Sequence, residues 1–225
     1  HAATCASRVY NYAIKMEHTH QNPWAKIERY STPQRKVVWQ HSDVIRFLDK
    51  AYSDYEYRNV GLIVQMAYEW CQRLGDMRTL QWENIDLATR VLTLEQSKRR
   101  ADVSLPISDE LVTMLNEQRK DFGFQEYVVP HPNPTMGKYE PYAMERLSKV
   151  GRRVMRLAGL PEELRLMDLR RTGVTQMIDS GVPMGQLMSV TGHNNVSSVK
   201  PYMKHTYDSA NNALTQRNIR VQSST

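Results

Sequence analysis

The chain has 225 residues, 40% of them hydrophobic, and carries 30 Lys and Arg against 24 Asp and Glu, a formal net charge of +6. This length allows one sizeable core, or one domain with a fragment of another, and the positive charge suits a polyanion such as DNA, although many ordinary proteins are as basic. The sequence contains no apolar run long enough to span a membrane and no signal peptide. It also lacks a P-loop, a Rossmann glycine run and a metal-binding motif. Cys5 and Cys71 lack zinc-like spacing, so we expect a reduced, cytoplasmic location in which both thiols are packed.

The chain begins with His1 rather than Met, so we expect that residues upstream are missing. An amphipathic pattern predicts a helix over residues 6–18. Proline-containing, polar and basic sequence follows it, and proline disfavours helix in the residue before it. The sequence therefore predicts three parts: residues 1–24 from a preceding domain, a linker over 25–38, and a second domain over 39–225.

The second domain opens with Ser42 as the expected N-cap of a helix. A longer helix with a broad apolar stripe is predicted over 56–72, and another helix runs to Trp82. Residues 90–95 and 101–105 have strand character, and the short basic connection between them predicts a small antiparallel hairpin.

The rest of the chain is predicted to be mostly helical, with helices over 108–120, 141–158, 168–180 and 184–190. Gly181 and Gly192 stand where C-terminal caps belong, and Pro183 opens a new element. The expected fold class is mainly α with a small antiparallel β-sheet.

Four short segments carry the candidate chemistry: 73–76 (Arg-Leu-Gly-Asp), Lys98 in the hairpin turn, 169–172 (Leu-Arg-Arg-Thr), and Thr-Gly-His at 191–193 with Tyr202 nine residues after the histidine. Their order and spacing resemble the tyrosine recombinase family, the phage integrases in particular. Each motif is weak alone, but the four in order form a strong signal. The resemblance implies an integrase-like catalytic fold, and it identifies residues 1–24 as the last helix of an upstream core-binding domain that clamps DNA.

By this resemblance, Arg73, Arg170 and His193 donate hydrogen bonds to the scissile phosphate. Guanidinium groups are permanently charged, planar donors that match the non-bridging oxygens of a phosphodiester in its transition state. Arg170 also lies close to the apolar face of its helix, where an unpaired charge is costly. The alternative for Arg73 is an exposed arginine at the start of a helix, and the alternative for Arg170 is a charge on the surface of its helix.

Lys98 matches the lysine that the family carries on its hairpin, where it protonates the leaving 5′-oxygen. Its alternative is a basic turn that contacts backbone phosphate. Asp76 lies one helical turn after Arg73 and matches the acidic residue that holds the arginine in place. A solvated surface acid or a helix cap is the alternative for Asp76.

Tyr202 is the predicted nucleophile, which forms a 3′-phosphotyrosine. A tyrosine hydroxyl has a pKa near 10 in peptides, so it must lose its proton during attack or beside cations. Pro201 fixes φ directly before it, and we expect Tyr202 to open a short helical turn. Tyr207 competes for the role, but its distance from His193 exceeds the family spacing.

The sequence departs from the family pattern at one position. The family usually has a histidine three residues before its second arginine, and Met167 stands there. Methionine is no strong hydrogen-bond donor and carries no proton. Either another side chain takes the role of this histidine, with His193 and Lys98 the nearest candidates, or the reaction step that the histidine assists is weaker in this protein.

The resemblance implies a site-specific recombinase that uses no metal or nucleotide cofactor. Its partners would be double-stranded DNA attachment sites, three further copies of itself in a tetramer on DNA, and a host accessory protein that bends DNA. Two alternatives remain: a DNA-binding protein that has lost catalysis, and a type IB topoisomerase, against which the sequence of the hairpin turn argues.

Overall fold

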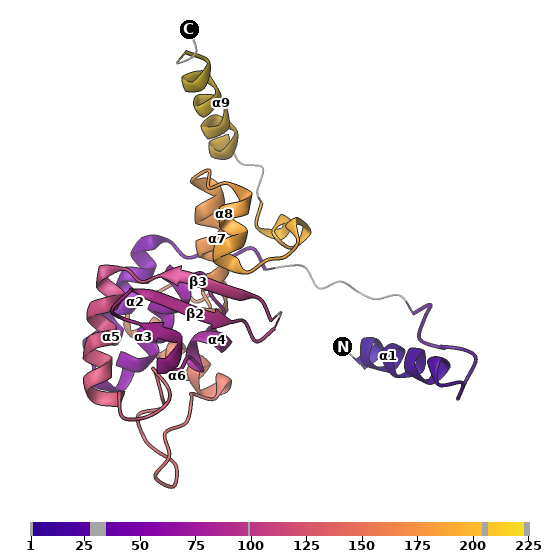
Figure 1. Ribbon diagram of the computed structural model, residues 1–225, viewed down its shortest axis with the longest axis horizontal. Helices are drawn as coiled ribbons and strands as arrows, with labels where there is room; N and C mark the ends of the chain where they lie inside the picture. Colours follow the sequence, from indigo (N-terminus) through magenta and orange to yellow (C-terminus); the bar gives the residue numbers. More distant parts are fainter. Residues whose placement is uncertain (1, 28–34, 99, 204–206, 223–225) are drawn as a thin grey trace. The chain divides into compact units, whose positions relative to one another are not determined.

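The computed structural model describes residues 2–27, 35–98, 100–203 and 207–222 and divides into two units, His1–Lys36 and Val37–Thr225 (Figure 1). The division falls inside the predicted linker, of which residues 28–34 lie outside the described part. The first unit contains α1 (Ala2–Lys15), which begins and ends earlier than predicted. Val9 and Met16 of its region are exposed, so this unit buries little of its apolar surface by itself.

The second unit is organised around α3 (Tyr55–Glu69), which is N-capped by the side chain of Asp54. Residues 59–67 of this helix are all buried, beyond the stripe that its sequence predicts, as expected of a helix packed on every side. The helices that contact it are α2 (His41–Tyr52), α4 (Leu74–Arg78), α5 (Asp109–Phe122), α6 (Met144–Leu157) and α7 (Leu169–Asp179).

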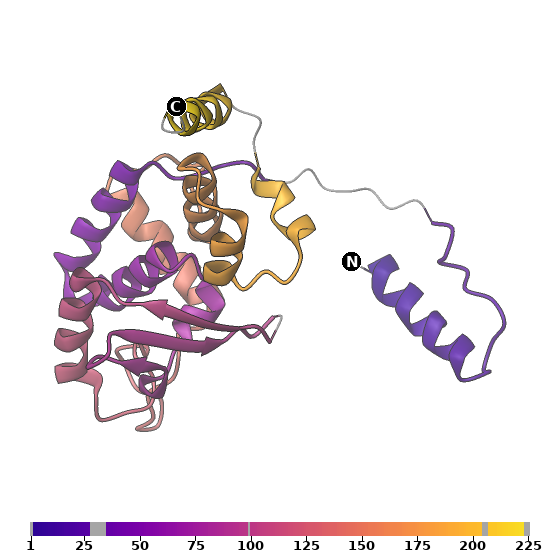
Figure 2. The same ribbon diagram turned by 45° about the horizontal axis from the view of Figure 1, so that its top comes forward.

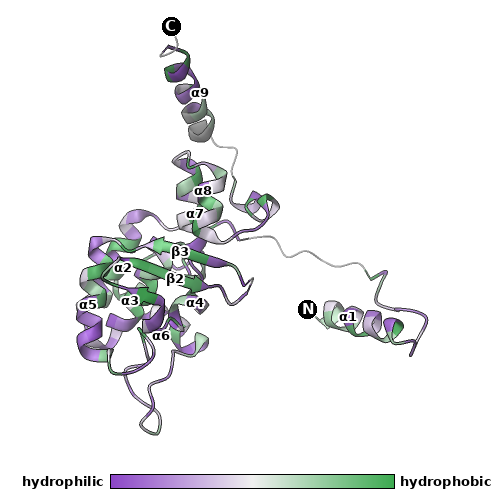
Figure 3. Ribbon diagram, in the orientation of Figure 1, coloured by the Kyte–Doolittle hydropathy of each residue, from purple (hydrophilic) through white to green (hydrophobic). Residues whose placement is uncertain are grey.

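The predicted hairpin is confirmed and forms most of a three-stranded antiparallel sheet in the order β1 (Ile85–Asp86), β2 (Val91–Glu95), β3 (Asp102–Pro106). Alternate residues of β2 and β3 are buried, with Leu92 opposite Leu105 and Leu94 opposite Val103. In Figure 3 the ribbons of β2 and β3 are largely green, the colour of hydrophobic residues. Strand β1 has two residues, too few to show an alternation of apolar and polar side chains, so the sequence did not predict it.

Two boundaries differ from the prediction. Helix α2 begins after Gln40, so Ser42 is not its N-cap; instead, the Asp43 carboxylate accepts a hydrogen bond from the Gln40 N–H at 3.1 Å and fixes the helix start. The single helix expected up to Trp82 is interrupted, because α4 ends at Arg78 and a separate 3-10 turn, η1 (Trp82–Asn84), follows it.

The C-terminal part of the second unit comprises α8 (Met184–Thr191), two 3-10 turns, η3 (Val196–Ser198) and η4 (Lys200–Tyr202), and α9 (Tyr207–Gln222) (Figure 2). As predicted, Gly192 ends α8 in the left-handed conformation, with φ +65°. The expectation that Tyr202 opens its turn is wrong, because Tyr202 is the last residue of η4.

A second, smaller core lies under these elements and consists of Cys71, Val174, Leu187 and Val199, with Tyr202 packed against it. It joins the end of α3 to α7, α8 and η4. This core therefore places the Tyr202 segment against the helix that carries Arg170. No helix in the described part of the chain is long and apolar enough to cross a membrane.

The close contact between α7 and the end of α3 gives a stability prediction. A Cβ added at Gly173 would lie 2.4 Å from the Cys71 Sγ and 3.2 Å from the Tyr68 carbonyl oxygen. We expect Gly173→Ala to lower the free energy of unfolding by about 1–3 kcal/mol through overpacking. Gly185→Ala is the matched control, because no atom lies within 4 Å of its added Cβ, and it should leave stability unchanged or raise it by up to about 1 kcal/mol. Denaturant unfolding measures both, and equal effects would contradict the packing described.

Candidate active site

Arg73 stands at the junction of α3 and α4, as the N-cap residue of α4. Its Nη1 donates a hydrogen bond to the Gln96 Oε1 at 2.9 Å and lies 3.6 Å from the Asp76 Oδ2. The side chain remains 23% exposed. Arg73 is therefore fixed at one edge of its guanidinium while part of the group faces solvent.

Asp76 is the carboxylate that joins α4 to the β2–β3 turn. Its side chain is 1% exposed, and its Oδ1 accepts hydrogen bonds from the Ser97 N–H and hydroxyl. Its Oδ2 has no hydrogen bond among the described residues and faces Arg73. The structure thus brings Asp76 to Arg73, and it also shows a contact with Ser97 that the sequence did not predict.

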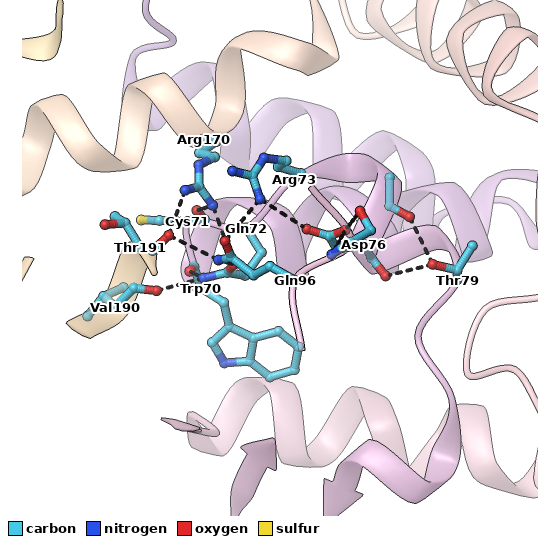
Figure 4. Close-up of polar contacts among 12 residues, drawn as sticks. Trp70, Cys71, Gln72, Arg73, Asp76, Thr79, Gln96, Arg170, Val190 and Thr191 are labelled. Carbon is cyan, nitrogen blue, oxygen red and sulfur yellow. Dashed lines mark hydrogen bonds and ion pairs between the residues drawn. The ribbon is translucent and has the colours of Figure 1, made fainter. Parts of the chain in front are cut away.

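Arg170 comes from the first turn of α7 and is buried, with 8% of its surface exposed. It donates to the carbonyl oxygens of Cys71 at 3.1 Å and Thr191 at 2.6 Å, and its Nη1 lies 3.4 Å from the Gln72 Oε1 (Figure 4). No carboxylate forms an ion pair with it among the described residues. All of its hydrogen-bond acceptors are neutral, so its charge is not cancelled by a direct partner.

Burial, and then the positive charge of Arg73, lower the pKa of Arg170 to about 10. The group therefore keeps its proton at neutral pH. Figure 4 shows the guanidinium groups of Arg73 and Arg170 side by side. Neighbouring like charges repel each other. An anion bound between the two guanidinium groups would reduce this repulsion and offset the cost of removing Arg170 from water.

His193 follows the C-cap of α8 and is buried, with 5% of its surface exposed. Its Nδ1 lies 2.7 Å from the Thr191 Oγ1, a hydrogen bond that fixes the ring. The ring centroid is 6.1 Å from that of Tyr202. His193 also lines a groove of about 540 Å³ together with Arg100 and Asn194.

Tyr202 lies between this histidine and α7. The Arg171 guanidinium stands 5.2 Å above its ring, within the range of a cation–π contact. Arg171 was not singled out from the sequence, although it directly follows Arg170. The alternative nucleophile, Tyr207, begins α9, and its side chain lies outside the described part of the structure.

Lys98 and Met167 do not join this cluster directly. Lys98 lies in the exposed turn after β2, without a hydrogen bond or ion pair among the described residues. Met167 lies in the 3-10 turn η2 (Leu166–Asp168), 70% exposed, and lines a cavity of about 220 Å³ with Arg152 and Arg165. Met167 is therefore on the surface rather than in the apolar core.

The structure brings together Arg73, Asp76, Arg170, His193 and Tyr202 from four separate segments. Three cationic or neutral donors and a tyrosine hydroxyl in one place can bind a phosphodiester and attack it. The sequence analysis missed Gln72 and Gln96, which are both fully buried beside the arginines. The available signal was their position in the sequence: Gln72 directly precedes Arg73, and Gln96 lies two residues before Lys98. The described residues contain no group of His, Cys, Asp and Glu that could hold a metal ion.

Comparison with known proteins gives a consistent result. The model of the phage integrase family matches residues 39–209. The chain is 26% identical over 148 residues to a protein of Sinorhizobium fredii named as an integrase/recombinase, y4gC, covering 63% of this chain and 74% of that one. It is 23% identical to the integrase of Salmonella phage P22, covering 62% of this chain and 38% of the phage protein.

Solved integrase structures have the same fold. A lambda integrase dimer bound to a COC′ core site superposes with a TM-score of 0.68 at 19% identity, covering 90% of this chain and 57% of that one. The Tn1549 transposon integrase in complex with transposon right end DNA gives a TM-score of 0.71 at 15% identity, covering 94% and 76%. The chain therefore spans little more than half of the lambda protein and less than half of the phage P22 integrase.

The burial of Cys71, whose carbonyl holds Arg170, can be tested by alkylation. Burial raises the pKa of the Cys71 thiol to about 11, so at pH 8 it is both protonated and shielded. Cys5, contrary to the expectation that both thiols pack, is exposed. We expect iodoacetamide at pH 8 to label Cys5 alone in the folded protein and both cysteines in guanidinium chloride, as measured by peptide mass spectrometry. Equal labelling of the two in the folded protein would contradict this account.

Proposed function

The chain belongs to the phage integrase family, and from this membership we propose that it is a site-specific recombinase, which cleaves and rejoins DNA strands through a covalent bond between Tyr202 and a 3′-phosphate. The observation that carries the proposal is the cluster of Arg73, Arg170 and His193 beside Tyr202. A protein that only binds the DNA backbone has no need of a tyrosine at this position.

In the proposed reaction, the two guanidinium groups and His193 bind the non-bridging oxygens of the scissile phosphate. The Tyr202 hydroxyl attacks phosphorus and loses its proton, a P–O bond to tyrosine forms, and the P–O bond to the 5′-oxygen breaks. The departing 5′-oxygen takes a proton, for which Lys98 on the exposed hairpin turn is the proposed donor. Attack by the 5′-hydroxyl of another strand reverses these steps and releases Tyr202.

The proposed partners are double-stranded attachment sites and further copies of the chain. A lambda integrase tetramer bound to a Holliday junction superposes with a TM-score of 0.68 at 17% identity, covering 90% of this chain and 58% of that one, which supports a tetramer. We propose that residues 1–24 belong to an upstream DNA-clamping domain and that the protein acts in the cytoplasm of a bacterial host. Assistance from a host DNA-bending protein is a further part of the proposal.

A nicked suicide substrate separates the proposed function from its two rivals. Cleavage next to the nick releases a short fragment, so the 5′-hydroxyl is lost and the covalent adduct accumulates. A covalent adduct excludes a protein that only binds DNA. Strand transfer between two separate duplexes would exclude a topoisomerase, which rejoins the strand that it cut.

We predict that Tyr202→Phe binds the same DNA with unchanged affinity and forms no covalent adduct, because the change removes only the attacking oxygen. Tyr207→Phe is the control and should form the adduct at the normal rate. Denaturing gel electrophoresis of the labelled suicide substrate measures both variants. An adduct in Tyr202→Phe, or its loss in Tyr207→Phe, would refute the assignment of the nucleophile.

Recombination should proceed in EDTA and without ATP, because the phosphotyrosine bond conserves the energy of the broken phosphodiester. The measurement is strand transfer between two duplexes with and without Mg²⁺. A strict requirement for Mg²⁺ in the cleavage step itself would point to a metal-dependent nuclease mechanism instead.

The exposed position of Met167, three residues before Arg170, allows its side chain to reach bound DNA. We expect Met167→His to add a hydrogen bond to a charged phosphate, worth on the order of 1.5–3 kcal/mol, and so to accelerate cleavage by roughly ten-fold or more. Met167→Gln, which adds an uncharged amide, is the control for polarity. An unchanged rate would mean that another residue, His193 or Lys98, already fills the role, and mutating that residue should then cost less in the Met167→His background than in the unmodified protein. An unchanged rate without such non-additivity would contradict the proposed placement of Met167.

A further inference from the structure

Two buried glutamines connect the two arginines of the candidate site. Gln72 and Gln96 are both 0% exposed. The Gln96 Oε1 accepts from Arg73 at 2.9 Å, and its Nε2 donates to the Gln72 Oε1 at 2.6 Å. The same Gln72 oxygen lies 3.4 Å from the Arg170 Nη1. A continuous chain of hydrogen bonds thus runs from Arg73 through Gln96 and Gln72 to Arg170.

The remaining donors of the two amides fix their orientation. The Gln96 Nε2 also donates to the Thr191 carbonyl at 3.0 Å. The Gln72 Nε2 donates to the carbonyls of Trp70 at 2.8 Å and Val190 at 2.7 Å. Turning either amide over would set N–H groups against an arginine or against each other and oxygens against carbonyls. Both oxygens therefore point toward the arginines.

The Gln96 amide packs directly against Gly192, the residue before His193. A Cβ at Gly192 would lie 2.8 Å from the Gln96 Nε2, and its φ of +65° is one that other residues rarely adopt. The carbonyls of Val190 and Thr191, which the glutamines bind, belong to the same end of α8. The glutamines therefore fix the start of the His193 segment as well as both arginines.

Amides meet two requirements that no charged or apolar side chain meets together. A carboxylate only accepts hydrogen bonds, so it would face the carbonyls without a proton to share, and its charge would offset that of the arginines. An apolar side chain would leave the arginine N–H groups and the backbone carbonyls without partners. A neutral amide satisfies both sides and leaves the positive charge available to an anion.

We propose that Gln72 and Gln96 are positioning residues, which hold Arg73, Arg170 and the His193 segment in one arrangement for the scissile phosphate. The proposal rests on the recombinase function proposed above. It assigns the glutamines no contact with DNA. Their removal should slow the chemical step while leaving DNA affinity unchanged.

The test uses single-turnover cleavage of a nicked duplex. A pool of nicked duplexes with randomised sequence is first incubated with the unmodified protein, and sequences are recovered from the covalent adduct. The recovered duplex then serves as substrate at saturating concentration. Two quantities are read: the amplitude, which reports the fraction of active molecules, and the rate constant, which reports the chemistry in those molecules.

We expect Gln96→Met to lower the rate constant by about 30- to 100-fold, the scale of a displacement of about 1 Å in a catalytic group. The amplitude and the dissociation constant for DNA should change by less than about two-fold. Should Gln96→Met fail to fold, Gln96→Asn, a neutral amide shorter by one methylene, replaces it with the same expectation, because it adds no charge beside the arginines and is too short to contact the same partners. The double variant with Gln96→Met and Gln72→Met should lower the rate constant no further than the more damaging single change, because the two residues act as one hydrogen-bonded chain.

Gln118→Met is the matched control. Gln118 is 1% exposed, and its amide contacts another amide, a carbonyl and an arginine, through Asn59, Val128 and Arg58, on the side of the fold formed by α3 and α5. It should lower the unfolding temperature, and with it the amplitude, but leave the rate constant unchanged.

A rate constant in Gln96→Met within about three-fold of the unmodified protein would overturn the proposal. So would equal losses of rate in Gln96→Met and Gln118→Met, or losses that multiply in the double variant. Failure of the recombinase function is a separate outcome, in which the unmodified protein forms no adduct with any member of the pool.

Discussion

The site depends on one electrostatic constraint: a buried guanidinium, Arg170, stands beside a second one, Arg73, and no carboxylate among the described residues forms an ion pair with Arg170. Burial of such a charge is costly unless its hydrogen bonds are satisfied. Here they are satisfied by backbone carbonyls and glutamine oxygens, which are neutral. In the part of the chain that the structure describes, the carboxylate at the cluster is that of Asp76, which lies 3.6 Å from the Arg73 Nη1 and also accepts a hydrogen bond from the Ser97 N–H. The cluster therefore keeps a net positive charge that an anion could offset.

Much of the surrounding architecture supplies those neutral acceptors. The chain leaves α3 through Cys71, whose φ of +51° lies in the left-handed region and whose carbonyl holds Arg170. Gly192 ends α8 so that the Val190 and Thr191 carbonyls face the glutamines. The small core under α7, α8 and η4 then brings Tyr202 to the same place. The two arginines and the tyrosine are therefore placed by the same packing.

The sequence predicted the elements with strong periodicity or clear caps: the β2–β3 hairpin, most of the longer helices and the Gly192 cap. It also named the arginines, His193 and Tyr202, because their order along the chain is informative. It could not predict that Gln72 and Gln96 are buried and joined, since this contact links residues 24 apart and depends on how the hairpin packs. The two-residue strand β1 and the end of η4 at Tyr202 likewise depend on tertiary contacts rather than on local pattern.

The central claim, that DNA becomes joined to Tyr202, is tested most directly by mapping the covalent bond. The adduct formed on a nicked duplex is digested with nuclease and trypsin, and the peptides are analysed by mass spectrometry. Since trypsin does not cleave before Pro201, Tyr202 lies on the peptide of residues 172–204 and Tyr207 on that of residues 205–217. The account predicts a nucleotide mass on the first peptide, with fragment ions that locate it at Tyr202. A nucleotide on the second peptide, or on any residue other than Tyr202, would contradict it.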